Sequence, residues 1–368
     1  MSDELKVGVV GSVGRGRSFF AAFHGNPNTR LHALCDLNEE GLAQQAEEQS
    51  VDATFTSYEQ MLDEAGVDMV VVGTPMPLHA PQAMMALRQD IHVLSEVPAA
   101  VSMEQAQDLV RVAGSSSAKY MMAENFGYNR TNVLVRELAH RGLFGELYFG
   151  EGAYIHELKG LNEITKWRRK WQTGINGCTY PTHSLGPVLQ WFRERVTAVS
   201  CVGTGHHYVD PRGDEYENED NILMLCRLSG SGLAHIRVDM LSDRPHCMNY
   251  YSLQGTEGCY ESGRGAGDKN KIWLRPLHGD EIQWHALEEL EEEYLPDKWL
   301  NPPEEALASG HWGGDYWEVA EFVDAIIADE QPPIGIHEAM DYTLPGLISQ
   351  QSIAQGSAWL DVPDSRGW

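Results

Sequence analysis

Short apolar runs alternate with amphipathic stretches over the first third of the chain. The apolar runs lie at residues 6–10, 31–35, 53–55, 69–72, 92–95 and 120–123. Continuous apolar runs bounded by turn residues are typical of strands buried on both faces, and the stretches between them repeat apolar positions at helical spacing. This alternation predicts a doubly wound parallel sheet over residues 1–123.

The pattern changes after residue 124. One helix is predicted over residues 129–141, with Gly142 as its stop. Strand-like segments then follow at residues 146–154, 198–204, 221–227, 234–239, 248–253 and 271–275. Strands that follow one another with few helices between them favour a mainly antiparallel open sheet. We therefore predict an α/β protein with an N-terminal Rossmann domain (1–123) and a C-terminal α+β domain for substrate binding and oligomerisation (124–368).

The end of the chain returns to a helical pattern, with a predicted helix over residues 316–328 and a proline-rich turn at 331–333. From about residue 310 these helices are expected to pack back on both domains. If another subunit covers the free face of the antiparallel sheet, the protein is a homodimer or homotetramer.

Composition narrows the range of partners and compartments. The 368 residues carry 42% hydrophobic side chains, which fits two folded cores, and a net charge of −27, which excludes nucleic acid and anionic membranes as partners. The start of the chain lacks a basic, long-apolar leader, no apolar run has the length of a membrane span, and six cysteines show no C-x-x-C spacing. We expect a cytoplasmic protein with reduced thiols and no metal site.

A glycine-rich turn follows the first apolar run and precedes a helix-like segment at 18–24. The turn residues expected to contact a cofactor are Gly11, Ser12, Gly14, Arg15 and Gly16. Backbone amides of such a turn, with the helix N-terminus, bind a pyrophosphate. Val13 stands where the common G-x-G-x-x-G pattern has its middle glycine, so a glycine turn that binds nothing is the alternative interpretation.

Asp36 ends the second apolar run, at the distance from the turn where a carboxylate accepts hydrogen bonds from a ribose 2′-hydroxyl. This favours NAD over NADP. Thr74 and His79 follow the fourth run, at the carboxyl end of the predicted sheet where such folds bind ligands. Both are candidates for cofactor contacts, with a helix-capping role as the alternative for His79. Ser102 and Gln105 form a predicted capping box.

A second group of motifs carries a family resemblance. Thr74-Pro75 with His79, Glu96-Val97-Pro98, and the glycine-rich segment around His183 follow in an order and spacing similar to the glucose-fructose oxidoreductase, inositol dehydrogenase and MocA (Gfo/Idh/MocA) family. The likeness runs from Lys6 to about Asp364. Within that family the chain most resembles the NAD-dependent glycosidases of glycoside hydrolase family 109, which cleave N-acetylgalactosaminides.

The resemblance implies a redox-neutral cycle. Tightly held NAD takes hydride from a ring carbinol, normally at C3, the neighbouring C2 proton is lost, the glycosidic group leaves by elimination, water adds, and the hydride returns. The resemblance gives His183 the role of general base or acid, Tyr154 that of a proton-transfer residue, and Tyr180 and Glu124 that of orienting groups. A cycle of this kind needs such bases and enolate-stabilising groups.

The same resemblance extends to cofactor and substrate contacts. Glu96 and Asn125 are expected to contact the cofactor, and Arg168 and His311 the sugar. Trp167, Trp171 and Trp312 are aromatic residues that either stack on a sugar or fill a core. The substrate we expect is a small sugar, glycoside or cyclitol in the cytoplasm.

Two other functions stay open. The ordinary dehydrogenases of the family carry lysine where this chain has Val97, yet the breadth of the family favours a plain NAD-dependent sugar or polyol dehydrogenase. Val13 and Val97 together also suit a non-catalytic nucleotide-binding protein. Taken singly, His183 is also compatible with a buried turn histidine, Tyr154 with an ordinary strand aromatic, and Arg168 with one charge of a basic stretch.

Overall fold

The computed structural model describes residues 4–245, 247–265 and 267–368, which form two compact units. The first unit contains the described residues up to Asn129, with Pro302–Met340 and Ser365–Trp368; the second contains Arg130–Asn301 and Asp341–Asp364. The predicted division into residues 1–123 and 124–368 treats the domains as consecutive segments. In the structure, residues from the last part of the chain complete the first unit. The division of the chain by function stays a prediction.

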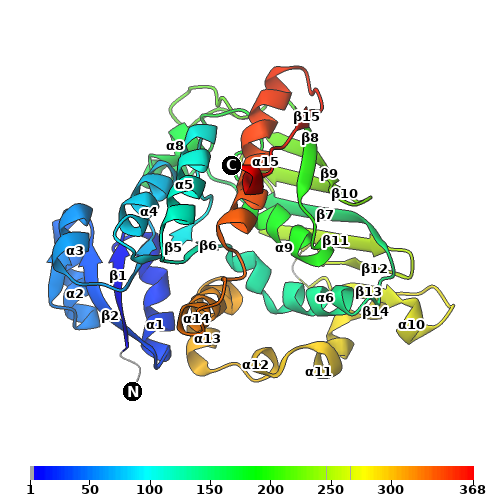
Figure 1. Ribbon diagram of the computed structural model, residues 1–368. Helices are drawn as coiled ribbons and strands as arrows, with labels where there is room; N and C mark the ends of the chain where they lie inside the picture. Colours follow the sequence, from blue (N-terminus) through cyan, green and yellow to red (C-terminus); the bar gives the residue numbers. More distant parts are fainter. Residues whose placement is uncertain (1–3, 246, 266) are drawn as a thin grey trace. The chain divides into compact units, whose positions relative to one another are not determined.

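A six-stranded parallel sheet forms the centre of the first unit (Figure 1). Its strands are β1 (Leu5–Val10), β2 (Thr29–Cys35), β3 (Ala53–Phe55), β4 (Met69–Val72), β5 (His92–Glu96) and β6 (Tyr120–Ala123). Their order is β3-β2-β1-β4-β5-β6, the doubly wound arrangement of a Rossmann fold. Every residue of β4 and β6 is buried, as expected for strands covered on both faces. The predicted parallel sheet is confirmed.

Helices cover both faces of this sheet. On one face α3 (Tyr58–Glu64), α4 (His79–Leu87) and α5 (Met103–Ser115) pack side by side, and on the other face α1 (Phe20–Gly25) packs with α14 (Gly314–Ile327) (Figure 1). The helix α2 (Glu39–Gln49) packs on β2 and β3. Half of the predicted capping box is present: the Ser102 hydroxyl accepts a 3.1 Å hydrogen bond from the Gln105 amide, but the Gln105 side chain accepts from the Val101 amide instead of that of Ser102.

The second unit is built on a nine-stranded sheet in the order β14-β13-β12-β11-β7-β10-β9-β8-β15 (Figure 1). Its strands are β7 (Leu147–Ile155), β8 (Val196–Gly203), β9 (Asn221–Leu228), β10 (Leu233–Asp239), β11 (Asn249–Gly255), β12 (Gly258–Glu261), β13 (Lys271–Leu274), β14 (His285–Ala286) and β15 (Leu360–Asp361). Every described pairing is antiparallel except that of β10 with β7. The predicted mainly antiparallel sheet is confirmed.

The helix α9 (Thr182–Phe192) lies across β7, β10 and β11, and α6 (Arg130–His140) packs on α9. Gly152 makes this close approach possible, because a Cβ at that position would collide with the carbonyl oxygen of Ser184. The sheet thereby fixes the position of the first turn of α9, which contains His183.

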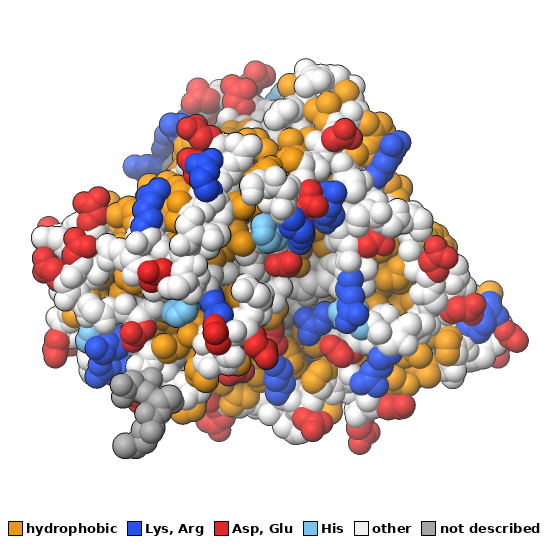
Figure 2. All heavy atoms as spheres, viewed as in Figure 1, with side chains coloured by type: hydrophobic (Ala, Val, Ile, Leu, Met, Phe, Trp, Pro, Cys, Tyr) orange, Lys and Arg blue, Asp and Glu red, His pale blue; other side chains and the backbone are white. Residues whose placement is uncertain are grey.

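Acidic side chains are spread over the visible surface rather than gathered in one patch (Figure 2). This distribution agrees with a net charge of −27 that comes from the whole sequence. Among the helices of the described ranges, none has both the length and the apolar character needed to cross a membrane.

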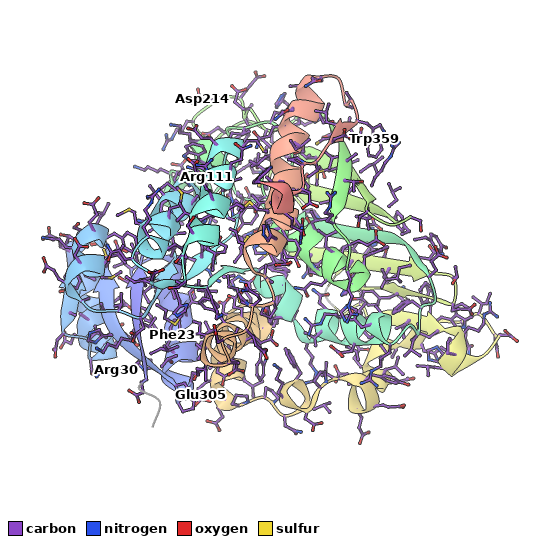
Figure 3. All side chains as sticks on the ribbon, in the orientation of Figure 1. Phe23, Arg30, Arg111, Asp214, Glu305 and Trp359 are labelled. Atoms are coloured by element: carbon purple, nitrogen blue, oxygen red, sulfur yellow. The ribbon has the colours of Figure 1, made fainter. Side chains whose placement is uncertain are left out.

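Three late segments of the chain join the first unit: α13 (Glu304–Ala308), the short helix η5 (His311–Gly313) and α14. Phe23 on α1 is fully buried, and Glu305 on α13 lies against the end of the same helix, at Gly25 (Figure 3). The buried residues Val319, Phe322 and Val323 of α14 continue this core. This packing places the start of α14 next to the glycine-rich turn.

Candidate active site

The glycine-rich turn lies between β1 and the short helix η1 (Arg15–Phe19). Gly11 has a φ of +80°, and a Cβ there would lie 2.5 Å from the carbonyl oxygen of Gly73, so only glycine fits. At Gly14, by contrast, the nearest atom to a Cβ is 3.7 Å away, an ordinary van der Waals contact, so a small side chain would fit there. Ser12 is buried and its hydroxyl donates to the carbonyl of Cys35. The turn has the tight backbone that holds a pyrophosphate.

Asp36 stands at the end of β2. One of its carboxylate oxygens accepts a 3.0 Å hydrogen bond from the Val13 amide, and the other accepts one from the Asn38 amide. Each carboxylate oxygen has a second lone pair, so the group can still accept from ribose hydroxyls. Asp36 therefore both braces the turn and presents an acceptor where a dinucleotide ribose binds.

Arg15 is the centre of a charged cluster. Its Nε donates to Glu96 at 2.6 Å, and its Nη1 and Nη2 donate to the two carboxylate oxygens of Asp315 at 2.8 and 2.7 Å. Burial disfavours the charged guanidinium, but these carboxylates outweigh that effect and raise the pKa of Arg15. The Arg15 side chain thus binds protein groups, and its predicted cofactor contact stays a prediction.

Two further predicted site residues meet at Asp315. The amide of Asn125 donates to Oδ1 at 2.8 Å, and Nδ1 of His311 lies 3.0 and 3.1 Å from the two carboxylate oxygens. Burial alone would raise the pKa of Asp315, yet the hydrogen bonds from Arg15 and His311 hold it well below its usual range. A fully buried aspartate therefore links the glycine-rich turn to η5 and to the segment after β6.

Glu318 lies one turn further along α14 and is fully buried. Burial, reinforced by the charges of Asp315 and Glu96, raises the pKa of Glu318 well above its usual value. Neither carboxylate oxygen has a described hydrogen-bond partner. Glu318 therefore holds its proton more tightly than an exposed carboxylate does, next to an ionised cluster.

The other residues predicted in the first unit lie at the carboxyl ends of the strands. Glu124, directly after β6, is fully buried and accepts a hydrogen bond from the Phe126 amide. The Thr74 hydroxyl donates to Gln82. The ring nitrogens of His79 lie 2.7 Å from the Thr74 carbonyl and 2.9 Å from the Pro98 carbonyl, so this buried histidine ties two loops together.

Three predicted catalytic residues come together in the second unit. Tyr154 is on β7, Tyr180 precedes α9, and His183 is in its first turn. Ring centroids are 5.3 Å apart for Tyr154 and His183, 5.1 Å for Tyr180 and His183, and 5.5 Å for the two tyrosines. All three are buried, with between 6% and 9% of their surface exposed. The cluster concentrates proton-transfer groups in one place.

Two neighbours hold this cluster. The Tyr154 hydroxyl shares a 2.8 Å hydrogen bond with Nδ1 of His156, and the Tyr251 hydroxyl donates to the backbone carbonyl of His183. A phenol bonded to an imidazole can pass its proton on without leaving its position. His156 therefore extends the proton-transfer group beyond the predicted residues.

Arg168 makes local contacts in the short helix α8 (Arg168–Trp171). Its guanidinium donates to Thr165 at 2.9 Å and to Gln172 at 2.8 Å, and it lies 4.5 Å from the ring centroid of Trp167. These bonds orient the group, and its contact with substrate stays a prediction.

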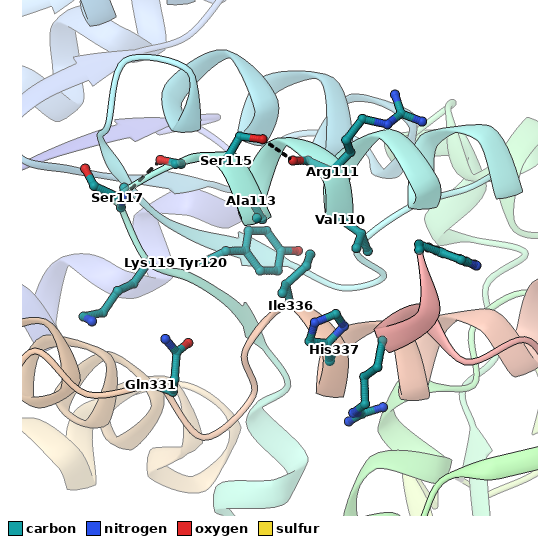
Figure 4. Close-up of a pocket in the computed structure, with 15 residues that line it drawn as sticks. Val110, Arg111, Ala113, Ser115, Ser117, Lys119, Tyr120, Gln331, Ile336 and His337 are labelled. Atoms are coloured by element: carbon teal, nitrogen blue, oxygen red, sulfur yellow. Dashed lines mark hydrogen bonds between the residues drawn. The ribbon is translucent and has the colours of Figure 1, made fainter.

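A hollow of about 650 Å³ lies between the end of α5 and the start of α15 (Ile336–Ala354) (Figure 4). Its cations are already paired with carboxylates: Arg111 with Asp108, Lys119 with Asp329, and Arg366 with Glu338. None of the predicted site residues lines it. The hollow offers no uncompensated charge for an anionic ligand.

No group of three metal-ligating side chains occurs in the part of the chain that the structure describes.

Sequence reasoning missed three residues of the two clusters: His156, Asp315 and Glu318. The sequence spacing could have indicated His156 and Asp315. His156 follows Tyr154 by two residues, which places both on one side of a strand, and Asp315 follows His311 by four, which is hydrogen-bond spacing on a helix. Burial of Glu318 had no local signal.

Two family models match the chain. The first, described as "Glycosyl hydrolase 109, C-terminal domain", matches residues 128–367. The second, described as "Oxidoreductase family, NAD-binding Rossmann fold", matches residues 5–124. The two matches together span almost the whole chain and coincide with the two sheets.

Similar proteins agree with both matches. A glycosyl hydrolase family 109 protein of Saccharopolyspora erythraea is 28% identical over 392 residues, covering 98% of this chain and 83% of its own. An alpha-N-acetylgalactosaminidase of Shewanella oneidensis is 28% identical over 396 residues, covering 98% and 84%. The crystal structure of levoglucosan dehydrogenase with NADH and levoglucosan has a TM-score of 0.82 at 19% identity, covering 98% of this chain and all of the other. The last likeness concerns the fold.

Proposed function

The chain belongs to glycosyl hydrolase family 109, and on that premise we propose that it cleaves a glycoside by a redox-assisted route that retains its NAD. The cofactor domain is of the NAD-binding oxidoreductase type. The observation that carries the proposal is the grouping of Tyr154, Tyr180 and His183, with His156 bonded to the Tyr154 hydroxyl. Sugar chemistry at a carbon acid needs such paired proton-transfer groups.

The residues of the first unit fit NAD. The turn at Gly11 leaves no room for a side chain, its backbone amides can bind a pyrophosphate, and Asp36 can accept from ribose hydroxyls. When bound, NAD supplies a hydride acceptor and donor, so no other redox partner is needed.

The residues of the second unit supply the proton transfers. We assign His183 and Tyr154 as the acid–base pair and Tyr180 as the residue that orients the imidazole, since its ring lies edge-on to that of His183 at 80°. His156 would accept or return the Tyr154 proton. Glu124 and Arg168 are assigned to orienting the substrate, and His311 to contacting it. The substrate class is a small sugar or glycoside, as the names of the similar proteins suggest.

A plain NAD-dependent sugar dehydrogenase is the second candidate, favoured by the fold shared with levoglucosan dehydrogenase.

One assay separates the glycosidase from the dehydrogenase. The purified protein is mixed with a nitrophenyl α-N-acetylgalactosaminide without added cofactor, and nitrophenol and NADH are followed together. Nitrophenol release without lasting NADH, absent in His183→Ala and kept in Tyr148→Phe, supports the glycosidase. NADH that accumulates only with added NAD and levoglucosan or myo-inositol supports the dehydrogenase. Silence in both assays, with no nucleotide bound, favours a non-catalytic binding protein.

We also propose that a second copy of the chain covers the open face of the nine-stranded sheet. Val202 on β8 and Leu225 on β9 point to this face and have 47% and 39% of their surface exposed. Trp359, which immediately precedes the edge strand β15, is 40% exposed. Light scattering with size exclusion should give a dimer or tetramer that Leu225→Glu dissociates; a monomeric wild type would refute this assembly.

A cytoplasmic location is proposed from the thiols. All six cysteines are free, and four of them are buried. Burial raises the pKa of Cys201 to about 11 and that of Cys226 further still, which keeps these thiols protonated and unreactive. Unpaired thiols are typical of a reducing compartment.

A further inference from the structure

Trp312 is the most exposed tryptophan among those that the structure describes, with 67% of its surface open. It belongs to η5, which immediately precedes the helix of Asp315. A single exposed apolar side chain needs no explanation by itself. Trp312 differs from an ordinary exposed side chain in its backbone conformation and in its neighbours.

The backbone around Trp312 is strained. Three consecutive residues have positive φ: His311 at 53°, Trp312 at 55° and Gly313 at 88°. This region is costly for bulky residues, and non-glycine residues kept there cluster at ligand sites. A glycine at position 312 would adopt the same backbone without strain. A tryptophan at this position therefore costs conformational free energy that a glycine would not.

Contacts on both sides fix the strained segment. His311 is bonded to the buried Asp315, and a Cβ at Gly314 would lie 2.5 Å from the Asn125 carbonyl, so the backbones are tightly packed. The Trp312 ring lies edge-on to Phe126, at a centroid distance of 6.2 Å and an angle of 85°. Phe126 lies in the short helix that begins two residues after the carboxyl end of β6, and ligands of doubly wound sheets bind at that edge.

The ring of Trp312 differs from two other tryptophans with sugar-binding potential. Arg168 lies 4.5 Å from the ring centroid of Trp167, and Lys170 lies 5.3 Å from that of Trp171. Trp312, within the described ranges, has Phe126 as its one ring neighbour and no cation over its face. Its face is available to an apolar surface of similar size.

We propose that Trp312 is the stacking platform for the pyranose ring of the substrate. The C–H groups on one face of a pyranose form an apolar patch that matches an indole face, while the sugar hydroxyls at its rim remain for polar groups such as His311. The inference rests on the proposed function and adds a specificity-determining residue to it. The substrate class is accordingly a hexopyranoside rather than an open-chain polyol.

The test compares Trp312→Ala and Trp312→Phe with Trp284→Ala, which removes another exposed tryptophan, 46% open and in the second unit. Steady-state kinetics use the NAD-loaded protein and nitrophenyl α-N-acetylgalactosaminide. We expect Trp312→Ala to raise KM about tenfold with kcat within about twofold, and Trp312→Phe to raise KM about threefold, because part of the stacking area remains. Trp284→Ala should match the wild type.

Three results would overturn the inference. One is an unchanged KM in Trp312→Ala. The second is a loss of NAD affinity with unchanged KM, which would make Trp312 a cofactor contact. The third is a change of oligomeric state with unchanged KM, which would make it a subunit contact. Thermal unfolding of each variant checks that the fold is intact.

Calorimetric titration of the NAD-loaded protein with N-acetylgalactosamine, levoglucosan and myo-inositol separates this inference from the proposed function. If the wild type binds none of the three and turns over no glycoside, the proposed function fails. If the wild type binds a pyranose and Trp312→Ala binds it equally well, only the inference fails. Weaker binding of the pyranoses with unchanged NAD affinity supports both.

Discussion

Arg15 and Asp315 are joined by two parallel hydrogen bonds, from Nη1 to Oδ2 at 2.8 Å and from Nη2 to Oδ1 at 2.7 Å. This forked geometry is the strong form of a guanidinium–carboxylate pair. It connects the glycine-rich turn to the first turn of α14, and Asn125 and His311 bind the same carboxylate. Asp315 therefore organises three segments of the first unit that are distant in sequence.

Replacing Asp315 tests this role. Asp315→Asn leaves the half-buried Arg15 without its bidentate partner at a fully buried carboxylate position, so the free energy of unfolding should fall by about 3–5 kcal/mol. Asp329→Asn is the matched control, because Asp329 pairs with Lys119 but is 95% exposed, and a change of about 0–1 kcal/mol is expected. Denaturant titration measures both. Equal, small effects would show that the Asp315 pair is not a structural link.

Glu318 predicts a pH dependence of stability. Its folded-state pKa is raised by burial and by Asp315 and Glu96, so the folded state binds this proton more tightly than the unfolded state. The stability is fully present below the unfolded pKa, and it falls as pH rises from there towards the folded pKa. Glu318→Gln removes this loss. Its unfolding temperature relative to wild type should therefore rise as the pH increases above about 4.5, the ordinary pKa of a glutamate.

The control for Glu318 is Glu304→Gln, an exposed carboxylate in the same unit. Its difference from wild type should be flat over the same pH range. A Glu318→Gln difference that is equally flat would mean that Glu318 is ionised in the folded protein.

Asp36 is expected to set the cofactor preference. Asp36→Ala removes a charged acceptor for ribose hydroxyls and the brace on the Val13 amide, so NAD should bind about tenfold to a hundredfold more weakly. The carboxylate of Asp36 repels the 2′-phosphate of NADP, so the affinity for NADP should fall less than that for NAD, or rise. Fluorescence titration with both dinucleotides measures the ratio. An unchanged ratio would remove Asp36 from the cofactor site.

The first sheet was largely predictable because its strands are buried on both faces. Such strands read as continuous apolar runs, and the predicted bounds of β4 and β6 agree with the structure residue for residue. In the second sheet the main strands were found, but β12, β14 and β15 were not. Two of these have two residues each, too few to show an alternating pattern.

The site was predictable only in part, for a physical reason. Motifs identify residues one at a time: they singled out Tyr154, Tyr180 and His183, whose rings lie together in the structure, while the roles of these residues stay predictions. The pairing of Arg15 with Asp315 depends on α14 packing beside η1, which no local pattern encodes. Long-range ion pairs follow from the tertiary fold and become visible only with it.

Tyr154 tests the chemistry of the second unit. Tyr154→Phe keeps the ring packing against His183 but removes the hydroxyl bonded to His156. General acid–base groups contribute about 10²–10⁴-fold, so kcat on a nitrophenyl glycoside should fall by that factor. Tyr148→Phe, on the same strand but 42% exposed, should leave kcat unchanged. A Tyr154→Phe enzyme with wild-type kcat and pH profile would exclude the hydroxyl from proton transfer.

Gly152 tests whether the contact between β7 and α9 positions His183. In Gly152→Ala the new methyl group would overlap the Ser184 carbonyl, so α9 must move away from the sheet. Overpacking of this kind costs about 1–3 kcal/mol of stability, and a small displacement of His183 should lower kcat far more than it changes NAD affinity. Gly114→Ala is the control: it lies in α5 with no atom within 4 Å of the added Cβ, so it should stabilise by about 0.5–1 kcal/mol. Loss of stability in Gly152→Ala with unchanged kcat would mean that α9 keeps His183 in place without this contact.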